Sequence, residues 1–508
     1  MKEIPQPKNL EAAQEVIATL SQALHYTQLE NEKLKHELAR LLRQSFGSKS
    51  EKIDPRQLFL LLEGLGIPAE QPIEDDACEI PRRLKTRKGG RGRRPLPKSL
   101  PREHIVVDIP EAEKICECGC RKVQIGSVVS EKLDYVPASF KVLEQERLRY
   151  ACPSCHEGVV TAEAPAQAVE KGLAAEGLLA QVVVSKYGDH LPLHRQSRIY
   201  SRHGIDLPRS TLCDFVEQVA TALAPIREEL KRQILSSDYL QTDDTPVSVL
   251  AETKGTFKGR IWTYLDPLEK QVVFDATPTH ERDGPDDFLE SFRGYLQADA
   301  YAGYDALYKQ PHRGIVEVAC WAHARRRFVE ALPTDARAAP MVKRIQELYE
   351  VEREGKDLDF ETRKQLREWR SIPILAEIEQ EREALEAVVL PKSPLGDAVR
   401  YMKNQWHALQ RFTEDGRLRI DNNGAEYQLR AVGIGRKNWL FAGSMEGAHR
   451  AAVLYSLVQS CQLVGVDPFV YFRDVLLRVA THPQSRIAEL TPAGWARTFG
   501  PDAVQTAS

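Results

Sequence analysis

The sequence predicts a multidomain α+β protein, and three observations lead to this prediction. With 508 residues the chain is too long for one hydrophobic core, and its length corresponds to roughly three or more domains. Helical periodicity precedes and follows one stretch, residues 238–305, whose pattern is that of β-strands. Five of the nine cysteines cluster between residues 116 and 155, which indicates a small module of another kind.

The amino-acid composition limits the classes of protein to which this chain can belong. Hydrophobic residues make up 42% and charged residues 28%, as in ordinary globular proteins, and no apolar run is long enough to span a bilayer. The first residues, MKEIPQPKNLEAAQ, lack the apolar core of a secretion signal, so we expect a cytoplasmic protein without a membrane partner. Disulfides are rare in that compartment, and the clustered cysteines therefore need another explanation.

Residues 1–50 predict a coiled-coil dimerisation helix. Core positions recur at alternating spacings of three and four, as in a heptad seam: Ile17, Leu20, Leu24, Thr27, Asn31, Leu34, Leu38 and Leu41. An asparagine at a core position, here Asn31, is typical of parallel dimers in which it sets the register. A single amphipathic helix packed on its own chain would give the same pattern, so both interpretations remain open.

Residues 51–100 predict a basic linker. The segment 81–98 reads PRRLKTRKGGRGRRPLPK and contains no acid, whereas the sequence just before it, EQPIEDDACE, is acidic. The net charge of the whole chain is only -3, so any contact with nucleic acid is expected at particular places, and this basic run is one of them. A solvated linker is an equally good interpretation and is compatible with the first.

Residues 101–164 predict a small zinc-binding module. Cys152 and Cys155 form a C-x-x-C pair, the spacing that lets two thiolates of one turn hold a tetrahedral zinc ion. Cys116 and Cys118 supply the other predicted pair, with Cys120 as an alternative ligand. A site closed by four protein ligands has no open coordination position, so we expect a structural Zn²⁺ that takes no part in chemistry.

Residues 165–232 predict a helix-turn-helix domain that binds DNA. The pattern indicates helices around 175–186 and 193–203, a turn at Gly204, and a third helix with Ser210 as its N-cap. In such a unit the later helix enters the major groove and basic side chains contact phosphates. The predicted DNA contacts are Arg195, Arg198, Arg202 and Arg209. Any three-helix packing unit has a similar pattern, so the spacing alone is weak support.

Acidic residues follow the strand-rich part of the chain in a characteristic order. Asp243 and Asp244 lie within the first predicted strand, and the apolar runs RIWTYLD and QVVFDAT complete a three-stranded meander. A further short strand ends at Asp299, and Glu426 falls one turn into a helix that begins around residues 422–424. A ribonuclease-H-like α/β sheet carries its carboxylates at these places.

Three carboxylates in this order suit phosphoryl transfer. The reaction uses two divalent cations about 3.5–4 Å apart, and hard cations such as Mg²⁺ or Mn²⁺ prefer oxygen ligands. Adjacent strand residues face opposite sides of a sheet, so only one of Asp243 and Asp244 can reach the metals. The predicted basic neighbours that hold DNA phosphates beside Glu426 are Arg430, Arg436 and Lys437. Each acid taken alone would be an ordinary surface carboxylate, and only their joint placement carries the prediction.

Several longer stretches resemble the insertion-sequence-66 (IS66) type of DDE transposases along almost the whole chain. They include QSFGSKSEK, PLPKSLPRE, IGSVVSEKLDYVPA, HLPLHRQSRIYSRHGIDLPRSTL, TDDTPV, LQADAYAGY, CWAHARRRF and IDNNGAEYQLRAVGIGRKNWLFAGS. The last stretch is the most specific. The resemblance implies a coiled coil, a zinc module, a helix-turn-helix and a catalytic domain over residues 233–450, with a helical insertion at about 330–415. A helical region, residues 451–508, would follow.

The family motifs assign roles to single residues of this chain. They align Asp243, Asp299 and Glu426 with the catalytic metal ligands and place Asp244 beside the first of them. The motif CWAHARRRF contributes Arg325 and Arg326, which we interpret as packing and DNA contacts near the site. For Cys320 and His323, in the same motif, a zinc role stays open. The third cysteine of CECGC departs from the family pattern and leaves the zinc ligands uncertain.

The prediction is a transposase that binds the terminal inverted repeats of a mobile element, cleaves DNA and transfers the 3′ ends to target DNA. The expected partners are element and target DNA, a second copy of the chain, and small accessory proteins of the same element. A non-catalytic DNA-binding regulator derived from such an enzyme is the competing interpretation. The presence of all three acids argues against it.

Overall fold

The computed structural model describes residues 139–150, 160–169, 172–251 and 253–500. The predicted coiled coil, the basic linker and all five clustered cysteines lie outside these residues. Strand β1 (Arg149–Tyr150) pairs antiparallel with β2 (Val160–Thr161), and Cys152 and Cys155 fall between the two strands in the sequence. From Leu143 onward the described residues belong to one compact unit.

Within the described residues, three helices precede the main sheet, and they match the predicted pattern. They are α3 (Glu176–Tyr187), α4 (Leu193–Ser201) and α5 (Arg209–Leu235). The turn between α4 and α5 contains Gly204 at a φ of +77°, a backbone conformation that glycine adopts without strain. The prediction of Ser210 as the N-cap is wrong. Pro208 holds that position, because its ring sets the φ needed there, and the helix begins two residues earlier than predicted.

Five strands form the main sheet, in the order β5-β4-β3-β6-β7. Their bounds are β3 (Tyr239–Leu250), β4 (Thr256–Asp266), β5 (Gln271–Thr277), β6 (Gly294–Gln297) and β7 (Ile315–Val318). The predicted antiparallel meander of β3, β4 and β5 is confirmed, and β6 and β7 add to β3 in parallel. Short helical segments connect the strands: α6 (Asp283–Phe288), η2 (Ala302–Tyr304), α7 (Asp305–Tyr308) and η3 (Pro311–Arg313).

Strand β6 is shorter than predicted. It ends at Gln297, two residues before Asp299, so Asp299 stands in the loop that leaves the sheet. The side chain of Asp299 accepts the backbone N–H of Tyr301 at 3.2 Å. Such a local bond between an aspartate and the backbone two residues on favours a turn over continued strand pairing.

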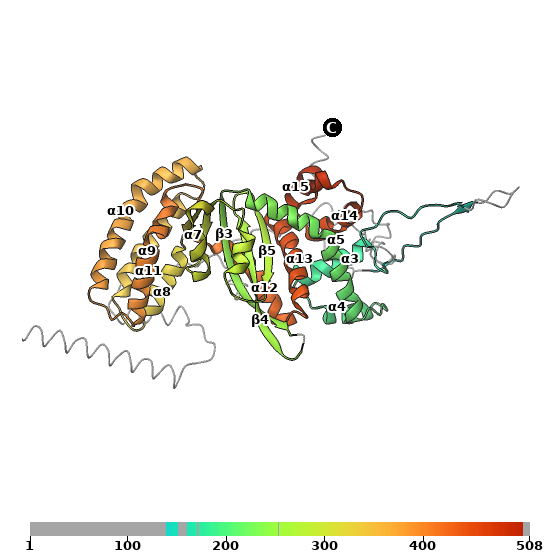
Figure 1. Ribbon diagram of the computed structural model, residues 1–508, viewed down its shortest axis with the longest axis horizontal. Helices are drawn as coiled ribbons and strands as arrows, with labels where there is room; N and C mark the ends of the chain where they lie inside the picture. Colours follow the sequence, from blue (N-terminus) through green and yellow to red (C-terminus); the bar gives the residue numbers. More distant parts are fainter. Residues whose placement is uncertain (1–138, 151–159, 170–171, 252, 501–508) are drawn as a thin grey trace, which may run out of the picture. The chain divides into compact units, whose positions relative to one another are not determined.

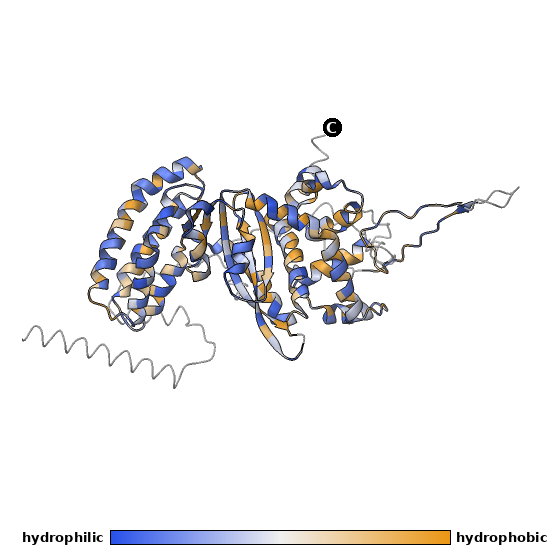
Figure 2. Ribbon diagram, viewed as in Figure 1, coloured by the Kyte–Doolittle hydropathy of each residue, from blue (hydrophilic) through white to orange (hydrophobic). Residues whose placement is uncertain are grey.

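Helix α13 (Met445–Leu463) covers the outer strand β5 (Figure 1). Ser456 Oγ accepts the backbone N–H of Phe274 at 2.8 Å, and Ser460 Oγ accepts that of Val272 at 3.1 Å. Apolar residues colour much of β5 and α13 in Figure 2, and both elements contribute to the larger hydrophobic core. The side of β5 that has no neighbouring strand is therefore both packed and hydrogen-bonded.

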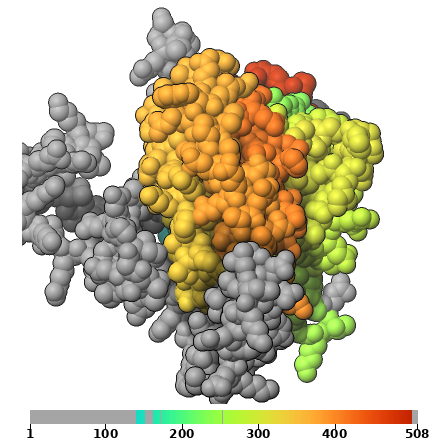
Figure 3. Space-filling view, turned by 90° about the vertical axis from the view of Figure 1, so that its left-hand side faces the viewer, coloured from blue at the N-terminus to red at the C-terminus, as the bar shows by residue number. Residues whose placement is uncertain are grey.

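Four helices stand between β7 and the helix that contains Glu426. They are α8 (Trp321–Ala331), α9 (Ala338–Glu354), α10 (Phe360–Glu386) and α11 (Pro394–Gln410), followed by the short η4 (Arg411–Thr413). They surround a second hydrophobic core (Figure 1), and Figure 3 shows the outer surface of α10 and its neighbours. Buried Arg367 pairs with Glu352 at 2.7 Å and donates to three backbone carbonyls, which ties α10 to α9 and to residues 412–418.

The rest of the described chain is helical. It contains α12 (Asn423–Trp439), α14 (Pro468–Arg478), η5 (Gln484–Leu490) and α15 (Pro492–Thr498). Helix α12 packs along β3 and β4, while α14 packs on α3 and α5. Among the described residues, no helix is both long and apolar enough to cross a membrane.

Candidate active site

Asp243, Asp299 and Glu426 come from three elements that meet at the sheet. Asp243 lies in β3, Asp299 follows β6, and Glu426 lies in the first turn of α12. Burial, and after it the negative charges of Asp299 and Glu426, raise the pKa of the Asp243 carboxyl to about 8. Charges influence a pKa in this way only over short distances, so the three carboxylates form one electrostatic group.

Asp299 occupies a similar setting. Burial raises the pKa of its carboxyl, and the charge of Asp244 acts in the same direction. The imidazole of His323 and the N–H of Tyr301 oppose this shift. A buried carboxylate with other acids nearby is costly to ionise, and a bound cation would remove that cost.

The structure separates the roles of Asp243 and Asp244. Asp244 is half-buried and already paired, with Arg260 Nη1 at 2.7 Å and His280 Nε2 at 3.1 Å. Asp243 Oδ1 accepts the backbone N–H of Asp244 at 2.8 Å, and no cation among the described residues pairs with it. Asp243 is therefore the acid of this pair that remains available for a metal ion.

A buried polar network holds the two aspartate-bearing strands in register. Tyr239, Leu240 and Gln241 of β3 pair with Tyr295, Leu296 and Gln297 of β6, so the first three residues of the repeated motif YLQ-x-D lie at matching heights, and Asp299 follows the end of β6. Gln241 Nε2 donates to Gln297 Oε1 at 2.8 Å, and the hydroxyl of Tyr239 donates to the same oxygen at 2.6 Å. The parallel pairing thus places Asp243 and Asp299 two residues beyond paired glutamines.

The same glutamines fix the segment that leads into α12. Gln241 Nε2 donates to the carbonyl of Asp421 at 2.9 Å, and Gln297 Nε2 donates to that of Arg419 at 2.8 Å. Asn422 Nδ2 donates to the carbonyl of Thr242 at 3.3 Å. Because these bonds join β3 and β6 to the start of α12, they set the position of Glu426 relative to the two aspartates.

Further contacts hold α12 along β3. A Cβ on Gly424 would collide with the Gln241 side chain and come within 2.9 Å of Leu265 Cδ2, so a larger residue here would force these two side chains to shift. Near the other end, Arg436 donates to Thr245 Oγ1 at 2.8 Å and to the carbonyl of Pro246. Arg436 is therefore a bridge to β3, which our prediction of a pure phosphate contact did not include.

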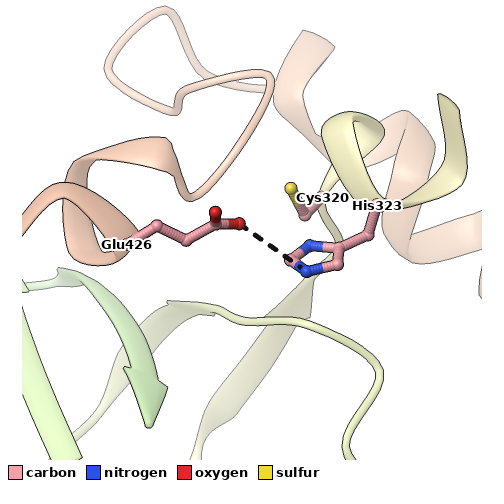
Figure 4. Close-up of side chains that lie close together, drawn as sticks. All are labelled: Cys320, His323 and Glu426. Carbon is pink, nitrogen blue, oxygen red and sulfur yellow. Dashed lines mark ion pairs between the residues drawn. The ribbon is translucent and has the colours of Figure 1, made fainter. Parts of the chain in front are cut away.

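Cys320 and His323 lie beside Glu426. Figure 4 shows the Glu426 carboxylate reaching toward the imidazole and the thiol, and His323 Nε2 is 3.6 Å from Glu426 Oε1. Arg326 Nη2 is 3.8 Å from Glu426 Oε2. Burial raises the pKa of the Cys320 thiol to about 12 and lowers that of His323, whereas the charge of Glu426 raises the pKa of His323. The CWAHARRRF segment thus contacts Glu426, one of the three candidate carboxylates.

The predicted basic residues fall into two exposed sets. Arg325, Arg326, Arg430 and Lys437 are exposed around α8 and α12, and Arg430 lies over the ring of Tyr427 at 5.4 Å. The second set, exposed on α4 and at the start of α5, consists of Arg195, Arg198, Arg202 and Arg209. Arg195 Nη1 donates to Asn438 Oδ1 at 3.4 Å, so α4 and the end of α12 are in contact.

Pattern reasoning missed several residues that shape the site. The glutamines of the two strands could have been found, because the repeated YLQ-x-D motif places a polar residue where a buried strand normally has an apolar one. Arg260 and His280 could not have been found from the sequence, because their pairing with Asp244 depends on contacts between distant segments.

The chain matches four family descriptions. Residues 171–450 match "Transposase IS66 family", residues 113–156 match "zinc-finger binding domain of transposase IS66", and residues 456–493 match "IS66 C-terminal element". The zinc-finger match contains all five clustered cysteines. Residues 33–105 match "Transposase C of IS166 homeodomain", a range that overlaps the predicted coiled coil and linker and not the helices from residue 165 on.

Curated relatives cover most of the chain. Three are Sinorhizobium fredii proteins with the names Uncharacterized protein y4hP, y4jD and y4qI. The y4jD protein is 33% identical over 492 residues, which are 91% of this chain and 94% of the relative. The y4hP protein is 34% identical over 430 residues, or 80% and 77%. The y4qI protein is 33% identical over 484 residues, or 91% and 88%.

No solved structure matches the chain. The catalytic-family match covers more than half of the residues, and it spans the whole sheet, α12 and the helices between them. All three proposed carboxylates, their glutamine network and the CWAHARRRF segment lie within it. The chain therefore belongs to the IS66 family of transposases.

Proposed function

We propose that the protein cleaves DNA at the ends of a mobile element and joins the 3′ ends to target DNA by metal-dependent phosphoryl transfer. The observation that carries this proposal is that Asp299 and Glu426, from two other elements, lie near enough to buried Asp243 for their charges to raise its pKa. The strand order, three antiparallel strands followed by two parallel ones, supports a ribonuclease-H-like fold for this region.

The residues present fit a pair of Mg²⁺ or Mn²⁺ ions. Hard divalent cations prefer carboxylate oxygens, and Asp243 has no cationic partner among the described residues. Asp243, Asp299 and Glu426 would hold the ions. Bound there, the ions would activate the attacking oxygen and stabilise the charge on the leaving oxygen.

The chain's own residues would position the DNA. Arg326, which reaches Glu426, and the exposed Arg430 and Lys437 are placed to bind phosphates beside the carboxylates. Arg436 orients α12 through its bonds to β3, and the network of Gln241 and Gln297 keeps the carboxylates in place without touching substrate. A preorganised set of charges of this kind lowers the barrier because no reorganisation is needed during the reaction.

Recognition of the element ends is assigned to the helices before the sheet. The guanidinium groups of Arg195, Arg198, Arg202 and Arg209 are exposed on α4 and α5, as expected for phosphate contacts. The bond between Arg195 and Asn438 connects this surface to α12. The homeodomain-type match at residues 33–105 supports a second DNA-binding element, and the predicted coiled coil would pair two protomers so that both ends meet.

The decisive experiment compares strand cleavage and end binding by the full-length protein. With Mg²⁺ or Mn²⁺, the wild type should nick end DNA and form a joined donor–target product. Asp299→Asn should bind ends with unchanged affinity but cleave at least about a hundredfold more slowly, since it loses a metal ligand. The exposed Asp305, paired with Lys309, provides the control Asp305→Asn, which should cleave normally.

Two outcomes would reject the proposal. Full cleavage by Asp299→Asn would show that the carboxylates have another role. Specific end binding by the wild type without any metal-dependent nicking would identify the protein as a DNA-binding regulator. Cleavage without a joined product would restrict the activity to that of a nuclease.

A further inference from the structure

Cys320, His323 and Glu426 bring three different donor atoms together. Cys320 directly precedes α8, His323 lies in the first turn of α8, and Glu426 lies in the first turn of α12 (Figure 4). One ligand atom from each residue lies within 4.8 Å of the other two. A thiol, an imidazole and a carboxylate at such separations can converge on one cation after small side-chain rotations.

Two of these groups have polar atoms that lack a hydrogen bond. His323 Nδ1 and Glu426 Oε1 are buried and have no hydrogen-bond partner among the described residues. Buried polar atoms are nearly always hydrogen-bonded, and those that are not frequently mark the site of an ion or a water molecule. These two atoms belong to two of the three residues of the cluster, as expected of residues that bind a cation.

The thiol is also placed as a metal ligand would be. Cys320 is fully buried, and its Sγ accepts the backbone N–H of Asn422 at 3.5 Å, next to the start of α12. Hydrogen bonds from the backbone to a sulfur atom orient a thiolate ligand and stabilise its charge. The same bond links the cysteine to the segment that positions Glu426.

We propose that Cys320, His323 and Glu426 form a zinc site that is separate from the predicted cysteine module and shares Glu426 with the proposed magnesium site. The donor set indicates zinc, because thiolate and imidazole are ligands of Zn²⁺, while Mg²⁺ takes oxygen ligands. On binding, the S–H bond of Cys320 is replaced by a sulfur–zinc bond, and the proton passes to solvent. Three protein ligands leave a fourth position for water or a DNA oxygen.

Glu426 can bind zinc at this site and still belong to the set of three acidic residues that it forms with Asp243 and Asp299. Its Oε1 faces His323 at 3.6 Å, whereas its Oε2 lies near Arg326 at 3.8 Å. One oxygen would bind zinc while the other stays free for a second cation. The zinc ion would then hold the acidic side chain of α12 against α8, and the site would form whether or not the proposed DNA chemistry takes place.

The test measures zinc in the purified full-length protein by mass spectrometry, without DNA. Cys320→Ser and His323→Ala should each contain one zinc equivalent per chain less than the wild type. Cys461→Ala removes another free, fully buried cysteine, in α13, and should retain the wild-type content. Asp299→Asn should also retain it, which separates this proposal from the proposed cleavage activity.

X-ray absorption on the wild type complements the variants, because it does not depend on how well they fold. The predicted cysteine module alone would give zinc with sulfur ligands only, whereas the proposed site adds nitrogen and oxygen ligands and a second zinc equivalent. An all-sulfur environment with one zinc per chain would overturn the proposal. Unchanged zinc content in folded Cys320→Ser and His323→Ala would overturn it as well, and would leave His323 as a metal-free neighbour of Glu426.

Discussion

Gln241 and Gln297 are register partners in neighbouring parallel strands, and their side chains are hydrogen-bonded at 2.8 Å. Each stands two residues before an aspartate of the candidate active site. Both are almost completely buried, at 1% and 0% exposure. Polar side chains in the middle of a sheet are costly unless satisfied, and here their bonds position Asp243, Asp299 and the start of α12 together.

We predict that Gln297→Met lowers both stability and cleavage. The substitution keeps the volume but leaves the hydroxyl of Tyr239 and the carbonyl of Arg419 without their partner, which should cost about 1–3 kcal/mol for each group left unpaired. Denaturant unfolding measures the loss, and cleavage should fall while end binding persists. Gln365→Met, at an exposed position of α10, is the control. Unaltered cleavage in a stably folded Gln297→Met protein would exclude a positioning role.

A second prediction concerns two glycines of α12. Gly424→Ala would push against Gln241 and Leu265 and should displace the first turn, so cleavage is expected to fall at least tenfold with end binding intact. Gly433 lies in the same helix with nothing within 4 Å of its built Cβ. Gly433→Ala should therefore stabilise the protein by about 0.5–1 kcal/mol and leave cleavage unchanged. Equal effects of the two substitutions on cleavage would contradict this account.

The raised pKa of Asp243 predicts a pH-dependent stability of the metal-free protein. Its carboxyl titrates near 3.8 when unfolded and at about 8 when folded, so the folded state holds more protons between these values. The free energy of unfolding attributable to this group is therefore highest below pH 3.8 and is lost as the pH rises toward 8. Asp243→Asn should remove this component and raise the Tm of the metal-free protein at pH 8.

Metal ions supply the control for the pH prediction. Mg²⁺ or Mn²⁺ should stabilise the wild type most at high pH, where the carboxylates are ionised, and should have a much smaller effect on Asp243→Asn. Thermal unfolding between pH 5 and pH 9, with chelator and with Mg²⁺, measures both. If the stabilities of the wild type and of Asp243→Asn changed with pH in the same way, Asp243 would not be the group that causes the pH dependence.

The exposed arginines of α4 predict a salt-dependent contribution to end binding. Arg198→Ala should weaken binding about equally for all sequences, and should reduce the slope of log K against log salt by about 1 if it contacts one phosphate. Binding titrations at several salt concentrations measure the slope. Arg353→Ala, on α9, is the matched control with a half-exposed guanidinium. An unchanged slope for Arg198→Ala would show that Arg198 does not contact a DNA phosphate and that the DNA-binding surface lies elsewhere.

Much of the fold could be predicted from local patterns. The strand-like residues of β3 and the apolar runs of β4 and β5 indicated the meander, and the glycine turn before α5 indicated the break between two helices. The end of β6 could not be placed, because the side chain of Asp299 competes with the strand for a backbone N–H. Local side-chain bonds of this kind change element boundaries without altering the hydrophobic pattern.

The candidate site was predictable only in outline. The order of the acids along the chain indicated which elements they occupy, but the choice between Asp243 and Asp244 depends on Arg260 and His280, which reach the second acid from other segments. The proximity of Cys320 and His323 to Glu426 likewise arises from the packing of α8 against residues 420–422. Contacts between residues a hundred positions apart leave no periodic trace in the sequence.

The serines of α13 have a consequence for assembly. The outermost strand of a sheet normally offers unpaired amides to any passing extended chain, and this is a common route to aggregation. In β5 two of these amides, those of Val272 and Phe274, already donate to Ser460 and Ser456. Another copy of the chain thus cannot extend the sheet at this side, and the proposed pairing of two protomers would have to use surfaces other than strand addition to β5.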